Sequence, residues 1–552
     1  MRVTRLGKLI PALAVAFRNE NIRRVELGWG AAIVAEWAHF VALGVFAYEA
    51  GGASAVGIAG LVRLLPAAVV APFAASLGDR FQRERVLLAM TLVGSGALAG
   101  SAAASFAGER VLVFAFASVV GIASTLIRPA LQALLPSLAR TPEELIAANG
   151  ATSTIESVGT VLGPLLAGVL VALADVGFVF IVAAGALLTA ALLLARVRVE
   201  GRISLSAAVE GESMRRMLGA GFRTLVRIHG ARLVVGLIVA QTFVRGCLNV
   251  LIVVAAFRVL HQGASAVGYL TAAIGVGGLI GAFGAMTLEG RRLAAPFGLA
   301  LVFWGVPIAL IAPSPYFAAA VVLLAIVGAA NSVEDVAVFT LLQRIIPDDF
   351  LTRVLGVAWG LAMGGVALGS IAAPTVVRGI GPRPAFLLVG SILPLLTLIT
   401  YRRLVEIDRT IAPTAELKLI DGVPMFAPLS VAAKEWLAAN LVPVSVTAGE
   451  LVIRAGEVGD CFYIVGDGEL EIDADGIHTT ASQADYFGEI ALLRNVPRTA
   501  TVTATVDSQL FALRRDHFLA AVTGHSAAHA AGQALAEARL TREHPTHGAS
   551  KR

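Results

Sequence analysis

Residues 487–502 read FGEIALLRNVPRTATV, and this stretch decides how the C-terminal part of the chain is interpreted. A phosphate anion is bound by exposed backbone N–H groups, a small residue that permits close approach and a bidentate arginine. Gly488, Ala491 and Arg498 supply these groups. Because a carboxylate repels phosphate, Glu489 fits such a site only if it accepts hydrogen bonds from another group, such as a ribose hydroxyl.

The sequence around this stretch alternates between apolar and polar residues. The apolar positions follow in steps of two and are separated by glycines: Val444, Val446, Leu451, Ile453, Phe462, Ile464, Leu470, Ile472, Val502, Ala504 and Val506. This period predicts a small soluble β-barrel or jelly roll. We expect the domain to span 416–540, with a helical pattern from Asp516 to Leu540 and a disordered tail over 541–552.

The chain before residue 400 has the composition of a membrane protein. The whole sequence is 57% hydrophobic and 15% charged, with a mean hydropathy of +0.81. Apolar runs of about 20 residues recur, and each can cross the bilayer. We predict an all-α polytopic protein in which twelve spans form two six-helix halves: 27–49, 54–76, 86–106, 110–134, 150–173, 176–195, 232–257, 265–287, 294–313, 316–343, 352–376 and 383–401.

The basic residues indicate which segments face the cytoplasm. They gather in the N-terminal segment 1–26, in the connector 196–231 and in the linker 402–415, whereas the loops near Gly51, Gly108 and Asp175 hold almost none. This asymmetry predicts a multi-pass plasma-membrane protein with both termini and the C-terminal domain in the cytoplasm. It also explains the net charge of +5 without a nucleic-acid partner.

A short internal repeat supports two halves, 27–195 and 232–401. Gln132 to Pro136 (QALLP) recurs as Gln343 to Pro347 (QRIIP), and Pro164 then corresponds to Pro374. A same-sense duplication is typical of transporters whose halves rock around a central site.

Residues 487–502 resemble the phosphate-binding cassette of cyclic-nucleotide-binding domains. The resemblance implies that Glu489 binds the ribose 2′-OH, Arg498 the cyclic phosphate, and the amides near Gly488 and Ala491 the phosphate oxygens. Thr499 stands where some members use a hydroxyl to favour cGMP. The implied regulatory ligand is cAMP or cGMP. One departure is that the helix after Phe518 has no aromatic residue to stack on the base.

The loop between the second and third spans resembles the cytoplasmic loop motif of the major facilitator superfamily. Its residues are Leu77, Asp79, Arg80, Arg83 and Arg85, although Ala75 and Gln82 replace glycines of the motif. The resemblance implies that Asp79, Arg80 and Arg83 tie the halves together on the cytoplasmic side and help to set the inward/outward equilibrium. The alternative is that these arginines only anchor the loop.

The predicted fifth span resembles a motif of the antiporters in that superfamily, and its surroundings resemble the drug-efflux and siderophore-export branch. The matching residues are Gly150, Gly159, Gly163, Pro164 and Gly168, with Ala167 in place of a glycine. The resemblance implies export. Ordinary close packing through small residues is the alternative.

Ionisable residues inside spans cost about 2.5 to 3.5 kcal/mol each and therefore need partners or a wet cavity. Glu36 and His39 are expected to share one face of the first span and are the first candidates for proton coupling. Glu156 and Asp335 are further candidates, and Arg63, Arg245 and Glu334 also lie in spans. Each of these residues has an alternative interpretation as a structural ion pair.

Together these patterns predict a proton-coupled exporter of a small molecule, regulated by cyclic nucleotide in its cytoplasmic tail. A membrane-tethered cyclic-nucleotide receptor without transport activity is the alternative. An enzyme is not expected, because the sequence shows no metal cluster, no nucleotide-hydrolysing P-loop and no nucleophile–base pair. No cofactor is expected beyond the regulatory ligand.

Overall fold

The computed structural model describes residues 17–80, 83–139, 141–197, 214–285, 293–314, 316–346, 348–409, 414–429, 431–474, 476–523 and 531–534. The chain divides into two compact units, a helical one that ends at Leu404 and a second one that begins at Val405. Each unit is described by itself.

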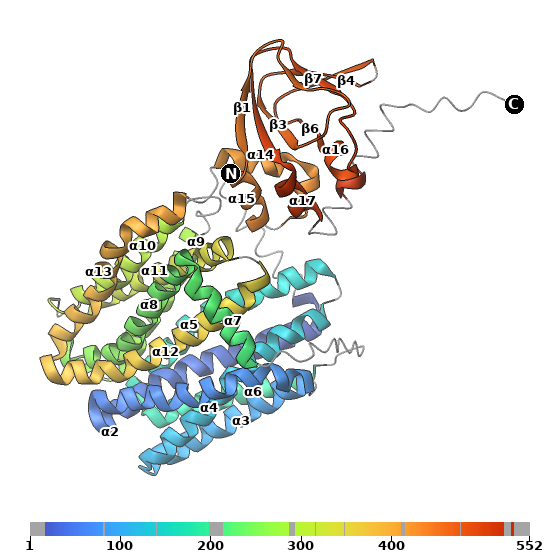
Figure 1. The fold of residues 1–552 in the computed structure, drawn as a ribbon. Coiled ribbons are helices and arrows are strands. Elements are labelled where there is room, and N and C mark those ends of the chain that lie inside the picture. The colour runs from blue at the N-terminus through green and yellow to red at the C-terminus, as the bar shows by residue number, and fades with distance from the viewer. Residues whose placement is uncertain are drawn as a thin grey trace. The chain divides into compact units, whose positions relative to one another are not determined.

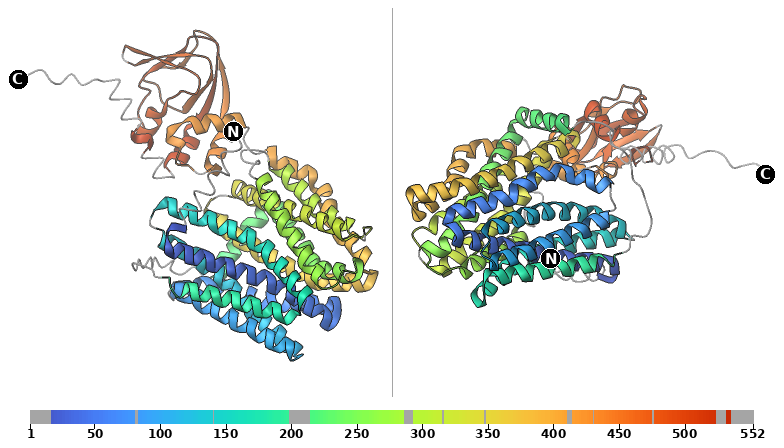
Figure 2. Two further views of the ribbon diagram at one scale, coloured as in Figure 1. Left: turned by 180° about the vertical axis from the view of Figure 1, so that it is seen from behind. Right: turned by 90° about the horizontal axis from the view of Figure 1, so that it is seen from below.

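The first unit is a bundle of long apolar helices that pack side by side (Figures 1 and 2). The helices are α2 (Glu20–Arg80), α3 (Arg83–Phe106), α4 (Arg110–Leu138), α5 (Pro142–Leu173), α6 (Val176–Leu194), α7 (Met214–Arg227), α8 (His229–Val254), α9 (Ser265–Ala285), α10 (Ala294–Leu310), α11 (Phe317–Ile345), α12 (Asp348–Ile380) and α13 (Pro382–Arg409). A π-helical turn, η1 (Ala255–Val259), extends α8.

Ten helices in the described residues are long and apolar enough to cross a membrane, whereas twelve spans were predicted. The first two predicted spans lie in α2, which consists of two helical segments separated at Gly51 and Gly52, where the backbone leaves helical geometry and Gly52 has φ = 63°. The ninth predicted span, α10, has 17 residues and is shorter than the others. The count is lower than twelve because α2 runs as one element across this two-glycine bend and because α10 ends at Leu310.

Glycines bring the two halves of the bundle together at two places. A Cβ on Gly57 of α2 would lie 2.6 Å from the Ser370 carbonyl oxygen of α12. A Cβ on Gly268 of α9 would lie 2.5 Å from both the Cα of Gly168 and the Pro164 carbonyl oxygen of α5. Only glycine leaves room for the neighbouring backbone at these two positions. The backbone of α2 therefore contacts that of α12 directly, and the backbone of α9 contacts that of α5.

The second unit is an antiparallel β-roll. Its strands are β1 (Val442–Val446), β2 (Leu451–Ile453), β3 (Cys461–Asp467), β4 (Leu470–Ala474), β5 (Ile477–Ala481), β6 (Tyr486–Phe487), β7 (Thr501–Ala504) and β8 (Ser508–Arg514). They form two four-stranded sheets in the orders β1-β8-β3-β6 and β2-β7-β4-β5. The predicted alternation places Val446, Ile453, Val465, Leu470 and Val502 in the core between the sheets. The alternation does not predict burial correctly for Leu451 and Val506, because both side chains are exposed.

Short helices cover one end of the roll: α14 (Thr414–Gly422), the 3-10 turn η3 (Pro424–Phe426), α15 (Val431–Ala439), α16 (Glu489–Arg494) and α17 (Arg515–Thr523). They share a second core with β3. In this core the ring of Phe518 stacks on Phe462 at 5.0 Å, and Phe426 packs edge-on against both. The phenylalanines therefore connect α17 and η3 to the strand that leads into the predicted ligand site.

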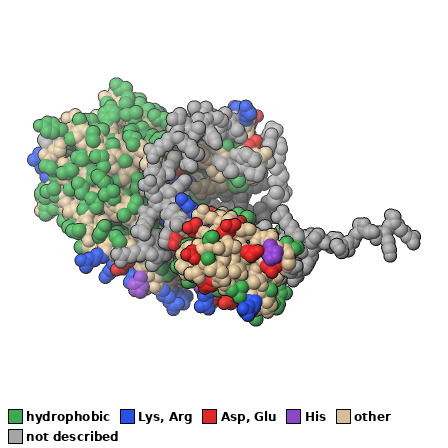
Figure 3. Space-filling view, turned by 90° about the horizontal axis from the view of Figure 1, so that it is seen from above, with side chains coloured by type: hydrophobic (Ala, Val, Ile, Leu, Met, Phe, Trp, Pro, Cys, Tyr) green, Lys and Arg blue, Asp and Glu red, His purple; other side chains and the backbone are tan. Residues whose placement is uncertain are grey.

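The surfaces of the two units differ in character. Hydrophobic side chains cover the visible face of the helical unit, whereas many Asp and Glu side chains lie on the visible face of the β-roll (Figure 3). The exposed apolar residues of the bundle include Leu173, Leu192, Ile280, Leu368 and Leu398. An apolar outer surface of this kind is suited to lipid rather than water.

Candidate functional site

The predicted phosphate site begins where β6 ends. Gly488 follows β6 with φ = 90° and forms the N-terminal cap of α16. A Cβ at this position would lie 2.6 Å from Nη1 of Arg498. Glycine is required here for two reasons, because L side chains rarely adopt this φ and because the guanidinium occupies the space.

Arg498 is the centre of the site. Its side chain is 4% exposed. Nη1 donates to the Gly488 carbonyl oxygen at 3.1 Å, and Nη2 donates to the Cys461 carbonyl oxygen at 2.7 Å and to Oδ1 of Asp460 at 3.4 Å. These bonds use three of the five N–H groups that a guanidinium carries. Arg498 therefore already has a structural role, and its two further N–H groups can serve an anion.

The other predicted residues lie around this arginine. Ala491 is buried and packs against Gly459. A Cβ added to Gly459 would lie 2.8 Å from the Cβ of Ala491. Glu489, the first residue of α16, is 1% exposed. Thr499 is exposed. The structure thus brings Gly488, Ala491 and Arg498 together, with Glu489 in the buried wall and Thr499 at the surface.

Several residues of this site were missed as ligand-site candidates. Asp460 and Cys461 bond the guanidinium, and the ring of Tyr463 lies 6.0 Å from its central carbon and stacks on Phe487 at 5.3 Å. Burial raises the pKa of the Cys461 thiol, so this side chain stays protonated at neutral pH. The glycine-rich turn before β3 was the signal in the sequence, because a tight turn lets the backbone approach a neighbouring side chain.

Arg515 links the site to α17 and was also missed. Its Nη1 donates to the Gly459 carbonyl oxygen at 3.0 Å, and its Nη2 donates to Oδ1 of Asn495. The backbone N–H of Arg515 donates to the Asp460 carbonyl oxygen at 2.7 Å. One residue thus joins the start of α17 to the two loops that flank Arg498.

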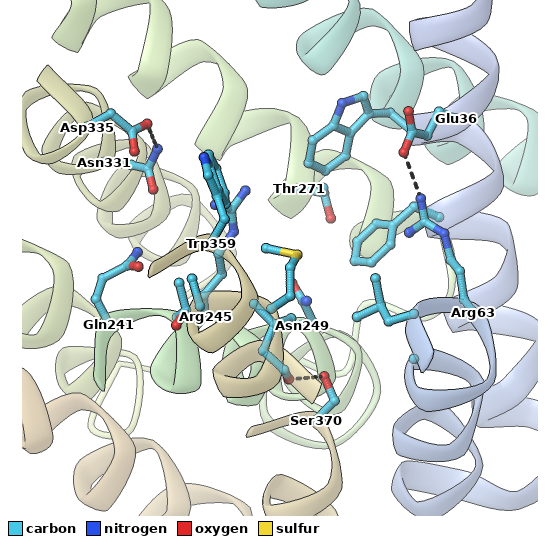
Figure 4. A pocket seen from close by; sticks show the side chains of 18 of the residues that line it. Glu36, Arg63, Gln241, Arg245, Asn249, Thr271, Asn331, Asp335, Trp359 and Ser370 are labelled. Carbon is cyan, nitrogen blue, oxygen red and sulfur yellow. Dashed lines mark hydrogen bonds and ion pairs between the residues drawn. The ribbon is translucent and has the colours of Figure 1, made fainter. Parts of the chain in front are cut away.

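A second candidate site is a cavity of about 960 Å³ in the helical bundle, lined by both halves (Figure 4). A volume of this size is sufficient for a drug-sized molecule. Its polar and aromatic lining residues come from α2, α4, α8, α9, α11 and α12: Glu36, Trp37, Phe40, Arg63, Arg128, Gln132, Gln241, Thr242, Arg245, Asn249, Thr271, Asn331, Glu334, Asp335, Phe339, Trp359 and Ser370.

Glu36 faces this cavity but is not paired with His39. Its Oε1 accepts from Nη2 of Arg63 at 3.0 Å, and the guanidinium of Arg63 lies 5.5 Å from the Phe40 ring centre. His39 does not line the cavity; it is fully buried, its ring lies 5.8 Å from that of Phe180, and neither ring nitrogen has a hydrogen-bond partner among the described residues. The expectation that Glu36 and His39 act together on one face is wrong, because the two side chains are about 60° apart around α2, and Glu36 faces the cavity whereas His39 is buried against Phe180 of α6.

The second half contributes its own charged group of residues. Asp335 on α11 accepts from Nδ2 of Asn331 at 2.9 Å, and Arg245 of α8 lines the same region (Figure 4). Glu334 is 4% exposed, and its Oε2 has no hydrogen-bond partner in the described part of the chain. Carboxylates and arginines therefore enter the cavity from both halves. Among the described residues that line the cavity, Glu36 and Arg63 of the first half form a close ion pair with each other.

The remaining predicted residues lie elsewhere. Glu156 of α5 pairs with Nη2 of Arg128 at 2.6 Å. Asp79 and Arg80 end α2 and Arg83 begins α3, but their side chains lie outside the described residues. In α5, a Cβ on Gly159 would lie 2.4 Å from Cγ2 of Ile33, and one on Gly163 would lie 2.6 Å from the Cβ of Trp37, whereas Gly150 has no atom within 4 Å. Gly159 and Gly163 thus pack on α2, and Pro164 and Gly168 pack on α9.

Fold and sites together define a polytopic helical protein with a central cavity and a ligand-binding β-roll. The sequence profile of the Major Facilitator Superfamily matches residues 27–358, and the chain belongs to this superfamily. The profile of the cyclic nucleotide-binding domain matches residues 443–525, so the chain carries such a domain at its C-terminal side. The chain is thus a multi-pass membrane protein that carries a cyclic nucleotide-binding domain.

Curated relatives match the C-terminal unit. The cAMP-dependent protein kinase regulatory subunit of Yarrowia lipolytica is 41% identical over 99 residues, which are 17% of this chain and 26% of that protein. The corresponding subunit of Blastocladiella emersonii is 45% identical over 87 residues, which are 15% of this chain and 22% of that protein. The chain thus spans about a quarter of the length of these relatives.

Among solved structures, the regulatory domain of Toxoplasma gondii PKA in complex with cAMP is similar, with 30% identity. The match covers 23% of this chain and 49% of that chain, with a TM-score of 0.20. A structure described as Sp-2Cl-cAMPS bound to PKAR CBD2 matches with 28% identity and the same TM-score, over 23% of this chain and 85% of that chain.

Proposed function

We propose that this protein is a secondary transporter that exports a small molecule across the plasma membrane in exchange for protons, and that cAMP or cGMP bound to its cytoplasmic tail modulates the flux. The observation that supports transport is the cavity of about 960 Å³ with charged side chains from both halves. A site between two pseudo-symmetric halves is the arrangement that alternating access requires.

Glu36 is the residue that we assign to proton coupling. Its carboxylate faces the cavity and is 34% exposed, so water and protons can reach it, while Arg63 holds it in place. A substrate that interacts with the deprotonated carboxylate of Glu36 would lose this interaction when Glu36 is protonated. Proton and substrate would then compete for the same carboxylate, as an antiporter requires.

The halves meet closely at Gly57 and Gly268, near the predicted outer end of the bundle. With the predicted topology, this contact closes the cavity toward the outside. The described conformation therefore corresponds to an inward-facing state, from which an exporter would load its substrate. The motif residues Asp79, Arg80 and Arg83 would act at the opposite, cytoplasmic end.

In the tail, Arg498 would bind the cyclic phosphate and Glu489 the ribose hydroxyl, with amides near Gly488 and Ala491 completing the phosphate site. The support is the convergence of Gly488, Ala491 and Arg498 around one buried guanidinium. To change the flux, the nucleotide must bind one conformation of the transporter better than the other. Such coupling amounts to about 1 to 3 kcal/mol, so we expect modulation rather than an absolute switch.

Accessibility of the cavity separates a transporter from a membrane-tethered receptor without requiring a known substrate. Met363 of α12 also lines the cavity. Cysteine is introduced at this position, Met363→Cys, in a chain that also carries Cys247→Ala and Cys461→Ser. The chain is then treated with a membrane-impermeant maleimide in right-side-out and in inverted vesicles. A transporter exposes position 363 from both sides in turn, whereas labelling from one side alone contradicts alternating access.

The proton assignment is tested in proteoliposomes that contain a pH-sensitive dye and are supplied with a panel of candidate substrates. Substrate-driven proton movement should be lost in Glu36→Gln. The control is Glu109→Gln, which removes a carboxylate outside the cavity at the N-terminal cap of α4. Proton movement that survives in Glu36→Gln would refute the assignment.

A further inference from the structure

Helix α7 lies at the point where the connector between the halves enters the bundle. It spans Met214–Arg227, and its sequence, MRRMLGAGFRTLVR, contains four arginines and no acidic residue. Ile228, in extended conformation, ends α7, and α8 begins at His229. Because α8 is an apolar membrane-spanning candidate, α7 is held one residue away from the start of a span. Figure 1 shows it crossing α12, against which it packs.

The protein covers only part of the apolar side of α7. Leu225 is 4% exposed, whereas Phe222 and Val226 are 52% and 44% exposed. The two exposed side chains are four residues apart and therefore neighbours on the helix surface. Leu225 is thus covered by protein, whereas the neighbouring Phe222 and Val226 are not. This pattern is typical of a helix that packs on protein along one side and contacts another apolar medium along the adjacent side.

Arginines follow this exposed pair. Arg223, Arg227 and Arg232 are exposed, and none of the three forms an ion pair within the described ranges of the chain. Nε of Arg223 donates to the Gly219 carbonyl oxygen at 3.2 Å, and Nη1 of Arg232 donates to the Val226 carbonyl oxygen at 3.4 Å. Each guanidinium thus retains N–H groups for an anion.

We propose that α7 is an interfacial helix whose Phe222 and Val226 insert at the acyl boundary of the cytoplasmic leaflet, while Arg223, Arg227 and Arg232 bind the phosphates of anionic phospholipids. A short basic helix with an apolar flank binds the membrane surface by these two contributions together. The direct connection to a span supports lipid as the occupant, because that connection keeps α7 at the height of the headgroups.

The experiment places an environment-sensitive fluorophore on the full-length protein through Val226→Cys, in the Cys247→Ala, Cys461→Ser background. Thr224→Cys is the matched control, because position 224 lies on the same helix about 160° from position 226, as 100° per residue requires. Labelled protein is reconstituted in nanodiscs of phosphatidylcholine alone or of phosphatidylcholine with phosphatidylglycerol, and is quenched by lipids that carry a spin label near the headgroup.

We expect several-fold stronger quenching at 226 than at 224, and a further increase when phosphatidylglycerol is present. Arg223→Gln combined with Arg227→Gln should remove that increase. Equal quenching at the two positions, or an identical signal in both lipid mixtures, would overturn the proposal. A signal at 226 that changes with cAMP but not with lipid composition would also overturn it, because α7 would then face the tail unit.

Discussion

At the scale of single residues, Arg498 has two functions that an alanine substitution would confuse. It satisfies the buried carbonyl oxygens of Gly488 and Cys461, and it offers its remaining N–H groups to the ligand. Leaving a buried acceptor unpaired costs about 1 to 3 kcal/mol. Arg498→Ala would therefore destabilise the β-roll even without ligand, and lost binding would not by itself identify a phosphate contact.

Arg498→Lys is the sharper change, because it keeps the charge and removes the planar fork. We expect the Kd for cAMP to rise about 10- to 100-fold, since a hydrogen bond to a charged group contributes about 1.5 to 3 kcal/mol. Calorimetric titration of the full-length protein in detergent measures the change. Arg514→Lys, at an exposed arginine on β8, serves as the control. Unchanged affinity in Arg498→Lys would argue against the assigned phosphate role.

Two glycine substitutions can separate the backbone strain of a positive φ from the steric overlap of a new side chain with Arg498. Gly488→Ala and Gly476→Ala both place a side chain at positive φ, 90° and 85°. Position 476 is open, whereas a Cβ at 488 would lie 2.6 Å from the arginine. We expect Gly476→Ala to destabilise by about 1 to 2 kcal/mol through backbone strain alone. Gly488→Ala should cost more and should also weaken cAMP binding.

Thermal unfolding with and without cAMP measures both effects. If the two variants lost equal stability and both retained nucleotide affinity, contact with the guanidinium would not be what makes glycine necessary at 488.

Prediction from sequence succeeded at this scale where the residues are neighbours in the chain. Gly488 and Arg498 belong to one short stretch, so their spacing alone indicated a shared site. Asp460 and Tyr463 reach the same arginine through the pairing of β3 with β6 and β8, which depends on long-range register. His39 was misplaced for a related reason, because i, i+3 spacing says nothing about which neighbouring helix covers each residue.

At the scale of elements, the internal repeat has a structural counterpart that the sequence alone did not show. Gly57 packs against Pro374, and Gly268 packs against Pro164. The two contacts are equivalent. Pro164 corresponds to Pro374 in the internal repeat, and Gly57 corresponds to Gly268 at nearly the same spacing along the chain. The same contact thus occurs twice, once between α2 and α12 and once between α9 and α5.

Widening either contact should favour the opposite state of the bundle. Gly57→Ala and Gly268→Ala each force overlap in the closed arrangement, which costs about 1 to 3 kcal/mol if the helices cannot relax. We expect each variant to increase labelling of Met363→Cys from the outside about 5- to 150-fold relative to the parent chain, because 1.4 kcal/mol corresponds to a tenfold change in the equilibrium.

Gly150→Ala is the control for these variants, since nothing lies within 4 Å of that position. Equal labelling in the two variants and the control would show that these crossings do not hold the outer end closed.

The elements were predicted more reliably by type than by boundary. The twofold period indicated the β-roll, and long apolar runs indicated the helices, because burial imposes both patterns. The break between the first two predicted spans falls at Gly51 and Gly52, where a short loop was expected and the structure has a two-residue bend. The basic character of the connector was visible in the sequence, but which of its residues the bundle covers was not.

At the scale of the whole molecule, the chain has two compact units. Regulation then means that nucleotide binding to one unit is thermodynamically linked to the conformational equilibrium of the other. If nucleotide binding changes the equilibrium between transporter conformations by some factor, a change in that equilibrium must alter nucleotide affinity by the same coupling free energy. This reciprocity holds whichever way the units are arranged. It also requires no knowledge of the substrate.

The bundle variants therefore provide a test of regulation through the tail. Gly57→Ala and Gly268→Ala lie in the helical unit, far along the chain from Arg498, yet both should shift the Kd for cAMP in the same direction. The shift should reach about 5- to 150-fold at a coupling of 1 to 3 kcal/mol. Gly150→Ala should leave the Kd unchanged. Calorimetric titration of the four full-length proteins measures this, and identical affinities in all of them would mean that the tail binds nucleotide without sensing the transporter.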